Sequence, residues 1–172
     1  ALDLRLLAIA ADADGGNTGA SRLLALSGRI SRRDVGTQLW QIERAVDQKD
    51  MIAALSAYDT TLRVQSAVAP LLYLRLANAL TDLEVRAAFV PLARKDPPWL
   101  DSFFAYSIQQ QIEPAALAGT AIAMGRLPGR AAFRTVEQQL IGLLAEKGLT
   151  IEARQFFLTI KGADRRELTN AT

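Results

Sequence analysis

Apolar residues recur at three- and four-residue spacing along much of this chain, and this periodicity limits the possible folds more than any other feature. Leu4, Leu7, Ala8 and Ala11 form one such stripe. The composition is rich in residues that favour helix, and β-branched residues never gather into alternating runs of strand length. The sequence therefore predicts an all-α protein of about ten helices.

Residues that start or stop helices divide the chain into segments. Residues 15–19 and 125–129 are glycine-rich and typical of tight turns, whereas Asp50 and Asp96 stand where helix N-caps are expected. Pro91 falls inside a helical pattern and predicts a kink or a break. Because the connections are short, successive helices should be antiparallel. The predicted helical hairpins span residues 2–30, 34–66 and 130–161, with less regular helices over 69–128.

The composition excludes several classes of function. The chain has 172 residues, no cysteine and no histidine, so disulfides, thiolate nucleophiles, Cys/His zinc sites and imidazole-based triads are absent. The net charge is only +2, so the chain does not have the concentrated positive field of a nucleic-acid-binding protein. The most apolar windows are shorter than the ~20 residues that a membrane-spanning helix needs. We therefore expect no cofactor, no metal, no catalytic residue, no nucleic-acid partner and no direct membrane insertion.

Three segments share a small residue followed four positions later by a large apolar one. They are Ala20 with Leu24, Ala54 with Tyr58, and Ala153 with Phe157. The first two alanines are separated by 34 residues, the period of the tetratricopeptide repeat. On these residues the chain resembles a degenerate tetratricopeptide repeat protein. The resemblance implies one domain over residues 1–172, with antiparallel hairpins stacked as a short right-handed TPR-like α-solenoid.

A narrower resemblance rests on the segment from Ser31 to Arg63. It contains the runs SRRD, QLWQIERAV and ALSAYDTTLR. This segment is similar to a group of uncharacterised alphaproteobacterial repeat proteins, in which a hydrophobic segment precedes the hairpins and a further domain follows them. The resemblance implies that this chain is an excised part of a cell-envelope protein, periplasmic or anchored in the inner membrane. A cytoplasmic location is the alternative.

The resemblance to tetratricopeptide repeats also implies a binding surface. In such stacks the first helix of each hairpin lines a concave face that holds extended peptides. The matching positions are Arg5, Asp12, Glu43, Asp47, Gln138 and Glu146. Most of them are acidic, which suits a basic or polar peptide. We therefore expect a non-catalytic protein–protein interaction scaffold.

Two other functions remain open at this stage. Leu2, Leu4 and Leu6 open the chain without a polar cap, which favours a structural or oligomerising spacer that self-associates. Acidic pairs such as Glu43 with Asp47 favour a carboxylate-based hydrolase, provided that the two groups converge in a deep pocket.

Several smaller motifs have structural interpretations that outweigh functional ones. Asp12 and Asp14 precede glycines as calcium ligands do, but the later ligand positions hold Gly16 and Leu23, so a turn is favoured. The basic clusters suit solvated helix ends. They are Arg29, Arg32 and Arg33, and Lys161, Arg165 and Arg166. The aromatic residues at helical spacing suit a core. They are Trp40, Tyr58, Trp99, Phe103 and Tyr106.

Overall fold

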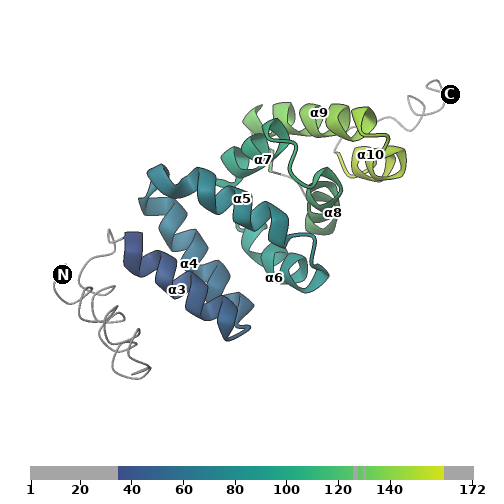
Figure 1. The fold of residues 1–172 in the computed structure, drawn as a ribbon. Helices are drawn as coiled ribbons and strands as arrows, with labels where there is room; N and C mark the ends of the chain where they lie inside the picture. Colours follow the sequence, from purple (N-terminus) through teal and green to yellow (C-terminus); the bar gives the residue numbers. More distant parts are fainter. Residues whose placement is uncertain (1–34, 126–127, 130, 161–172) are drawn as a thin grey trace. The chain divides into compact units, whose positions relative to one another are not determined.

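Every described element of this protein is a helix. The computed structural model describes residues 35–125, 128–129 and 131–160. These residues form eight α-helices and one short 3₁₀ helix and contain no strand (Figure 1). The predicted all-α class is confirmed for this part of the chain. The hairpin expected over residues 2–30 lies outside the described residues, so the total of about ten helices stays a prediction.

The helices belong to two compact units that divide between Val68 and Ala69. The first unit holds α3 (Val35–Asp47), α4 (Met51–Val64) and the 3₁₀ helix η1 (Ser66–Val68). The second holds α5 (Ala69–Ala79), α6 (Leu83–Ala93), α7 (Leu100–Gln109), α8 (Pro114–Met124), α9 (Ala131–Glu146) and α10 (Thr150–Phe157).

The first unit contains the hairpin that the sequence predicts over residues 34–66. Helices α3 and α4 pack against each other. Asp50 is the N-cap of α4, as expected, and its Oδ1 accepts a hydrogen bond from the Ala53 N–H at 2.9 Å. Ala54 and Tyr58, the small and aromatic pair, are both buried. The hairpin and its cap are therefore confirmed.

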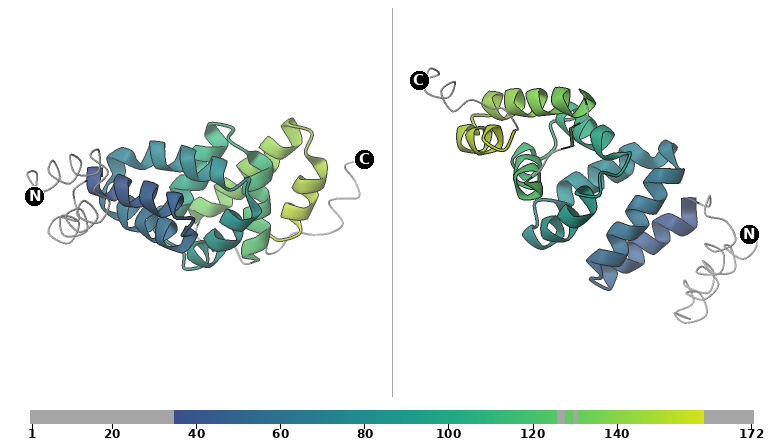
Figure 2. Two further views of the ribbon diagram at one scale, coloured as in Figure 1. Left: turned by 60° about the horizontal axis from the view of Figure 1, so that its bottom comes forward. Right: turned by 180° about the vertical axis from the view of Figure 1, so that it is seen from behind.

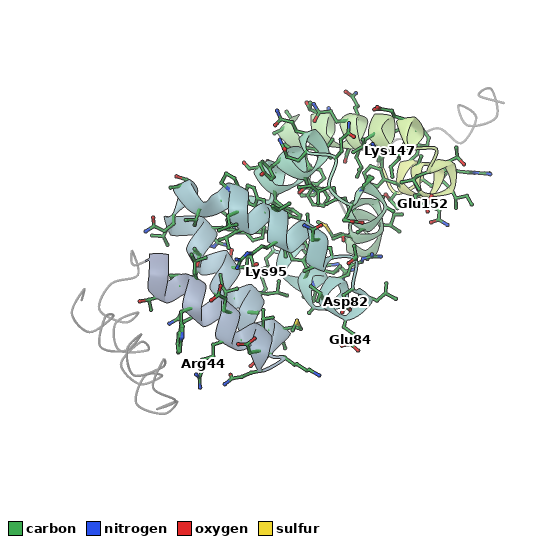
Figure 3. The ribbon with its side chains drawn as sticks, in the orientation of Figure 1. Arg44, Asp82, Glu84, Lys95, Lys147 and Glu152 are labelled. Carbon is green, nitrogen blue, oxygen red and sulfur yellow. The ribbon has the colours of Figure 1, made fainter. Side chains whose placement is uncertain are left out.

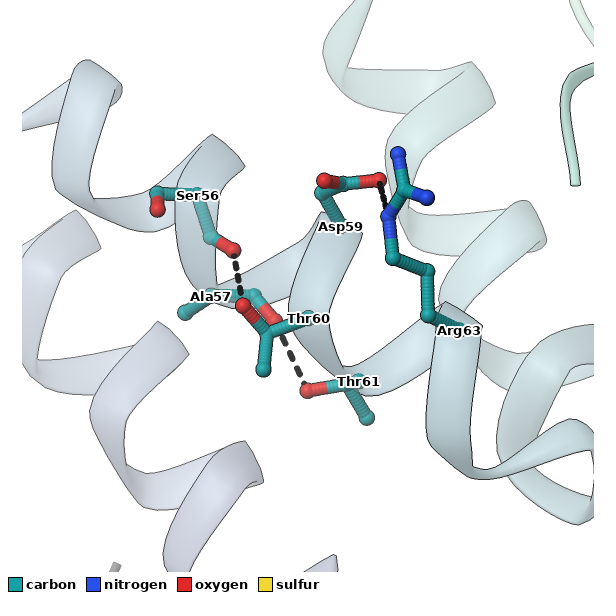
Figure 4. A network of polar contacts seen from close by, with 6 residues as sticks. All are labelled: Ser56, Ala57, Asp59, Thr60, Thr61 and Arg63. Carbon is teal, nitrogen blue, oxygen red and sulfur yellow. Dashed lines mark hydrogen bonds and ion pairs between the residues drawn. The ribbon is translucent and has the colours of Figure 1, made fainter. Parts of the chain in front are cut away.

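Polar side chains of α4 are satisfied within their own helix (Figure 4). The Thr61 hydroxyl is completely buried and donates to the Ala57 carbonyl at 2.7 Å. The Thr60 hydroxyl likewise donates to the Ser56 carbonyl at 2.9 Å. Because a buried hydroxyl without a partner would destabilise the fold, this bond explains how a threonine is tolerated in the packed face.

In the second unit alternate helices lie side by side in two rows (Figure 1, Figure 2). Helix α7 packs against both α5 and α9, and α8 packs against both α6 and α10. The last two helices, α9 and α10, also pack against each other across the turn at Gly148, which has a φ of 72°. The predicted hairpin over 130–161 is therefore present, although α10 ends at Phe157.

A cluster of aromatic rings forms the core of the second unit. Phe103 of α7 lies at its centre, with ring centroids 5.8 Å from Phe89 and 5.8 Å from Tyr73. Phe104 of α7 contacts Phe133 of α9 edge to face at 5.3 Å. Such contacts between fully buried rings hold neighbouring helices in register. The core interpretation is thus confirmed for Phe103.

Three local predictions differ from the structure. Helix α6 continues through Pro91 and ends two residues later, so the helix does not break there, and the alternative of a kink stays a prediction. Asp96 is not a cap, because α7 begins only at Leu100. The chain passes through a turn at Pro98 and Trp99 before α7, so Trp99 takes the N-cap position.

The third difference concerns the register of α10. Phe156 has only 1% of its surface exposed, whereas Phe157 is half-buried. Ala153 is also half-buried. The small and aromatic pair of this hairpin is therefore less buried than Ala54 and Tyr58 of the first unit.

Candidate functional site

An open groove of about 500 Å³ lies between α7 and α9 in the second unit. Helix α7 and the turn after it contribute Ala105, Ile108, Gln109 and Gln111. Helix α9 contributes Gln139, Gly142, Leu143 and Glu146. A groove of this volume is within the range of small-molecule and short-peptide sites.

The contribution of α9 follows from helical periodicity. Its four lining residues are spaced three and four apart and therefore share one face of the helix. A buried stripe of the same helix runs beside them and anchors α9 in the unit. That stripe consists of Phe133, Val136, Leu140 and Leu144. The groove is therefore the border between the packed and the exposed sides of an amphipathic helix.

Gly142 makes a gap in the wall that α9 presents to the groove. A Cβ atom placed on this glycine would meet no atom within 4 Å. Close packing therefore does not require a glycine here, even though glycine destabilises a helix interior by roughly 0.5–1 kcal/mol relative to alanine. The open space belongs to the groove.

The wall on the α7 side is held by a tight turn. Gln111 has a φ of 53°, in the left-handed region, and its N–H donates to the Ile108 carbonyl at 2.9 Å. The Ile112 N–H then donates to the Ser107 carbonyl at 2.9 Å. Gln109 and Gln111 therefore extend from a hydrogen-bonded helix end.

The groove combines amide groups with a single charge. Three glutamines line it, and each side chain offers two N–H donors and one carbonyl acceptor. Glu146 is the only ionisable residue in the lining. The remaining surface comes from Ala105, Ile108, Leu143 and the gap at Gly142. This arrangement can bind amide-like polar groups and a cation, but it offers no second carboxylate for acid–base chemistry.

The described residues that the sequence predicted as a binding face belong to both units, and each unit is considered by itself. Glu146 lines the groove, whereas its helix neighbour Gln138 is exposed and lies outside the lining. Glu43 and Asp47 are exposed on α3 in the first unit. Arg5 and Asp12 lie outside the described residues.

Most residues of the groove were not predicted from the sequence. Gln109, Gln111, Gln139 and Gly142 were not among the candidate residues. One available signal was Gly142 itself, since a glycine among strong helix formers calls for a specific reason. The contribution of α7 had no such signal, because it depends on which helix packs beside α9.

The acidic residues of the described part are surface groups. None of its aspartates or glutamates is buried, and Asp47 and Asp50 are exposed, as the sequence analysis expected. Burial does raise the pKa of the half-buried Glu137, against the opposing effect of Arg134. Charged side chains such as Glu84 and Lys147 lie on the outside of the helices (Figure 3). The described residues therefore contain no pair of carboxylates enclosed in a deep pocket.

Two arginines bind backbone carbonyls at helix ends. The Arg86 side chain donates from Nε and Nη2 to the Leu80 carbonyl just after α5, at 3.1 and 2.9 Å. Arg94 donates from Nε to the Met124 carbonyl at 3.0 Å and from Nη2 to the Ala123 carbonyl at 2.8 Å, at the end of α8. Because these carbonyls have no partner within their helices, both arginines have a structural role.

Neither metal ligands nor a membrane span is found in the described ranges. No group of three or more His, Cys, Asp or Glu side chains there could hold a metal ion. None of the helices in those ranges has the length and apolar character to cross a bilayer.

Comparison of the chain with protein-family models, with curated proteins and with solved structures finds no match in any of the three. The resemblances to tetratricopeptide repeats and to alphaproteobacterial proteins therefore rest on sequence patterns alone. Function has to be inferred from the chemistry of the groove.

Proposed function

We propose that this chain is a non-catalytic protein-interaction module that holds a peptide segment of a partner protein in the groove between α7 and α9. The observation that carries this proposal is the lining of the groove, with three glutamine amides and one carboxylate beside apolar side chains. Peptide backbones present the N–H and C=O groups that glutamine side chains bind. Glu146 belongs both to this lining and to the set of residues that the sequence predicted to bind peptide.

The helix contacts support the finer fold proposal, a short TPR-like α-solenoid. In the second unit α5, α7 and α9 form one row, and α6, α8 and α10 form the other. Stacked hairpins have this contact pattern, and repeat proteins of this kind bind ligands along one row of helices. A groove between two neighbours of one row agrees with that mode of binding.

The test is a cross-linking pull-down from the source cells with three forms of the chain. Gly142→Trp fills the groove, whereas Ala132→Trp places the same side chain at an exposed position of α9 outside the lining and is the matched control. A protein recovered by the wild type and by Ala132→Trp, but not by Gly142→Trp, supports the proposal. Partners recovered equally by all three forms contradict it.

A second candidate function is self-association, as in the structural or oligomerising spacer. Ile151 on α10 is 69% exposed, and Leu158, the C-cap residue just after the helix, is 45% exposed. They are seven residues apart and Leu158 keeps helical backbone angles, so the two lie on one side of the helix. Large exposed apolar side chains on one face favour contact with another protein surface. If this face joins copies of the chain, Ile151→Lys with Leu158→Lys converts an oligomer to a monomer in light scattering, and a monomeric wild type excludes it.

A further inference from the structure

We infer that the groove between α7 and α9 selects an extended peptide segment in which an apolar side chain fills the gap at Gly142 and a lysine or arginine two positions away pairs with Glu146. This inference rests on the proposed function and specifies the ligand of the same site. It follows from the dimensions of the groove, from its amides, from the gap and from its charge.

The length of the groove suits a short extended segment. From Gln139 to Glu146 the α9 wall rises by seven steps of ~1.5 Å, which is roughly 10 Å. An extended chain rises about 3.3 Å per residue, so three ligand residues cover the same distance. A helical ligand would bring a cylinder about 10–12 Å wide, which exceeds what a volume of about 500 Å³ accommodates over that length.

The glutamine amides in the groove also favour an extended ligand over a helical one. A helix already uses its backbone N–H and C=O groups internally, and the usual groove for a helix is apolar. An extended segment has backbone groups without partners. Gln109 and Gln111 on one wall, and Gln139 on the other, can satisfy these groups from both sides of the groove.

The gap and the charge have the spacing of alternate side chains in an extended ligand. Gly142 and Glu146 are four residues apart on one helix, which is about 6 Å along its axis. In an extended chain, residues i and i+2 point to the same side and lie about 6.6 Å apart. The space at Gly142 lies between helices that also contribute Ile108 and Leu143, so it suits an apolar side chain.

The negative charge of the groove selects a basic side chain at the ligand residue two positions from the apolar one. Glu146 is the only charged residue in the lining, and it is also the last residue of α9. The partial negative charge at a helix C-terminus adds to the attraction of a cation. Lys147 follows directly but is not part of the lining, so the groove presents a carboxylate to the ligand.

The experiment is selection of phage-displayed random octapeptides on the full 172-residue chain, in wild-type form and as Ala132→Trp, Gly142→Trp and Glu146→Lys. Ala132 is exposed on α9 outside the groove lining, so Ala132→Trp is the matched control for the tryptophan. We expect wild type and Ala132→Trp to enrich peptides with an apolar residue two positions from lysine or arginine. Glu146→Lys should replace the basic preference at that position by an acidic one. Replacing the basic residue of a selected peptide by norleucine should weaken binding about five- to tenfold, as expected for a partly solvated ion pair.

The possible failures distinguish this inference from the proposed function. Selected peptides that ignore Glu146→Lys but are lost with Gly142→Trp overturn the apolar-and-basic spacing while peptide binding in the groove still holds. A helical ligand, shown by apolar residues enriched at three- and four-residue spacing, overturns it in the same way. Peptides that bind Gly142→Trp as well as wild type, or no enrichment at all, overturn the proposed function and this inference together.

Discussion

Helices α8 and α9 each contain a glycine in their interior, and the two glycines have opposite surroundings. Helix α8 carries no charged side chain and packs against α6, α7, α9 and α10. An ideal Cβ on its Gly119 would lie 2.6 Å from Nη1 of Arg86, so the glycine makes room for that side chain. Helix α9 has one buried stripe, and a Cβ on its Gly142 would meet nothing within 4 Å.

The difference shows that a glycine in the interior of a helix can mark either a packed contact or an open site. A helix that is apolar on nearly all sides is buried by neighbours on all sides, whereas an amphipathic helix keeps one side open. The glycine in the first makes room for an arginine side chain, and the glycine in the second leaves space that a ligand can occupy. Four measurements test this contrast.

The largest effect is expected from a charge in the packed helix. Ala121 of α8 is completely buried, so Ala121→Asp should lower the free energy of unfolding by ~3 kcal/mol or more, because it buries an unpaired carboxylate. The matched control is Ala132→Asp, an exposed alanine in the first turn of α9. It should change stability by no more than about 0.5 kcal/mol. Equal effects in urea unfolding would refute the contrast between the helices.

The second test places the same large side chain at both glycines. Gly119→Leu has to displace the Arg86 guanidinium from the Leu80 carbonyl and should destabilise the protein by about 1–3 kcal/mol. Gly142→Leu meets no atom at its Cβ and should stabilise the protein by about 0.5–1 kcal/mol, because leucine favours helix more than glycine does. Thermal unfolding of the two variants should therefore shift in opposite directions.

A double-mutant cycle then tests whether Arg86 is the reason for the glycine in α8. Gly119→Ala should gain about 1 kcal/mol more in an Arg86→Ala background than in the wild type, because the displaced side chain is gone. Gly142→Ala should show the same gain in both backgrounds. Additive effects at Gly119 would mean that Arg86 moves aside without loss.

The smallest effect concerns pH. Burial raises the folded-state pKa of Glu137 on α9, so the folded protein prefers the protonated carboxyl. The stability that this preference contributes is present at pH values below the ordinary carboxyl range and is lost as the pH rises through the raised pKa.

The corresponding variant is Glu137→Gln. Its unfolding free energy, relative to wild type, should increase by about a few tenths of a kcal/mol between pH 3 and pH 7, because Glu137 remains partly solvated. An opposite trend in urea titrations at the two pH values would contradict the burial effect. Helix α8 has no titratable side chain, so it contributes no pH dependence of this kind and is the comparison for α9.

The helical class and several helix boundaries could be predicted from local sequence. Asp50 caps α4 because a carboxylate before a helix accepts a first-turn N–H wherever the helix packs. Gly125 ends α8 with a φ of 70°, a conformation that glycine adopts without strain.

Packing partners and the groove could not be predicted in this way. The three- and four-residue periodicity shows that α9 has an apolar face, but α7 lies beside it because Phe104 and Phe133 pack across the two helices from positions 29 residues apart in the chain. Glu146 was predicted from the resemblance to tetratricopeptide repeats, whereas Gln109 and Gln111 were not predicted, because their place in the groove depends on this packing. Local residues specify helices, caps and turns through short-range hydrogen bonds and sterics. Whether an interior glycine faces an arginine or an open groove depends on which distant side chains the fold brings next to it.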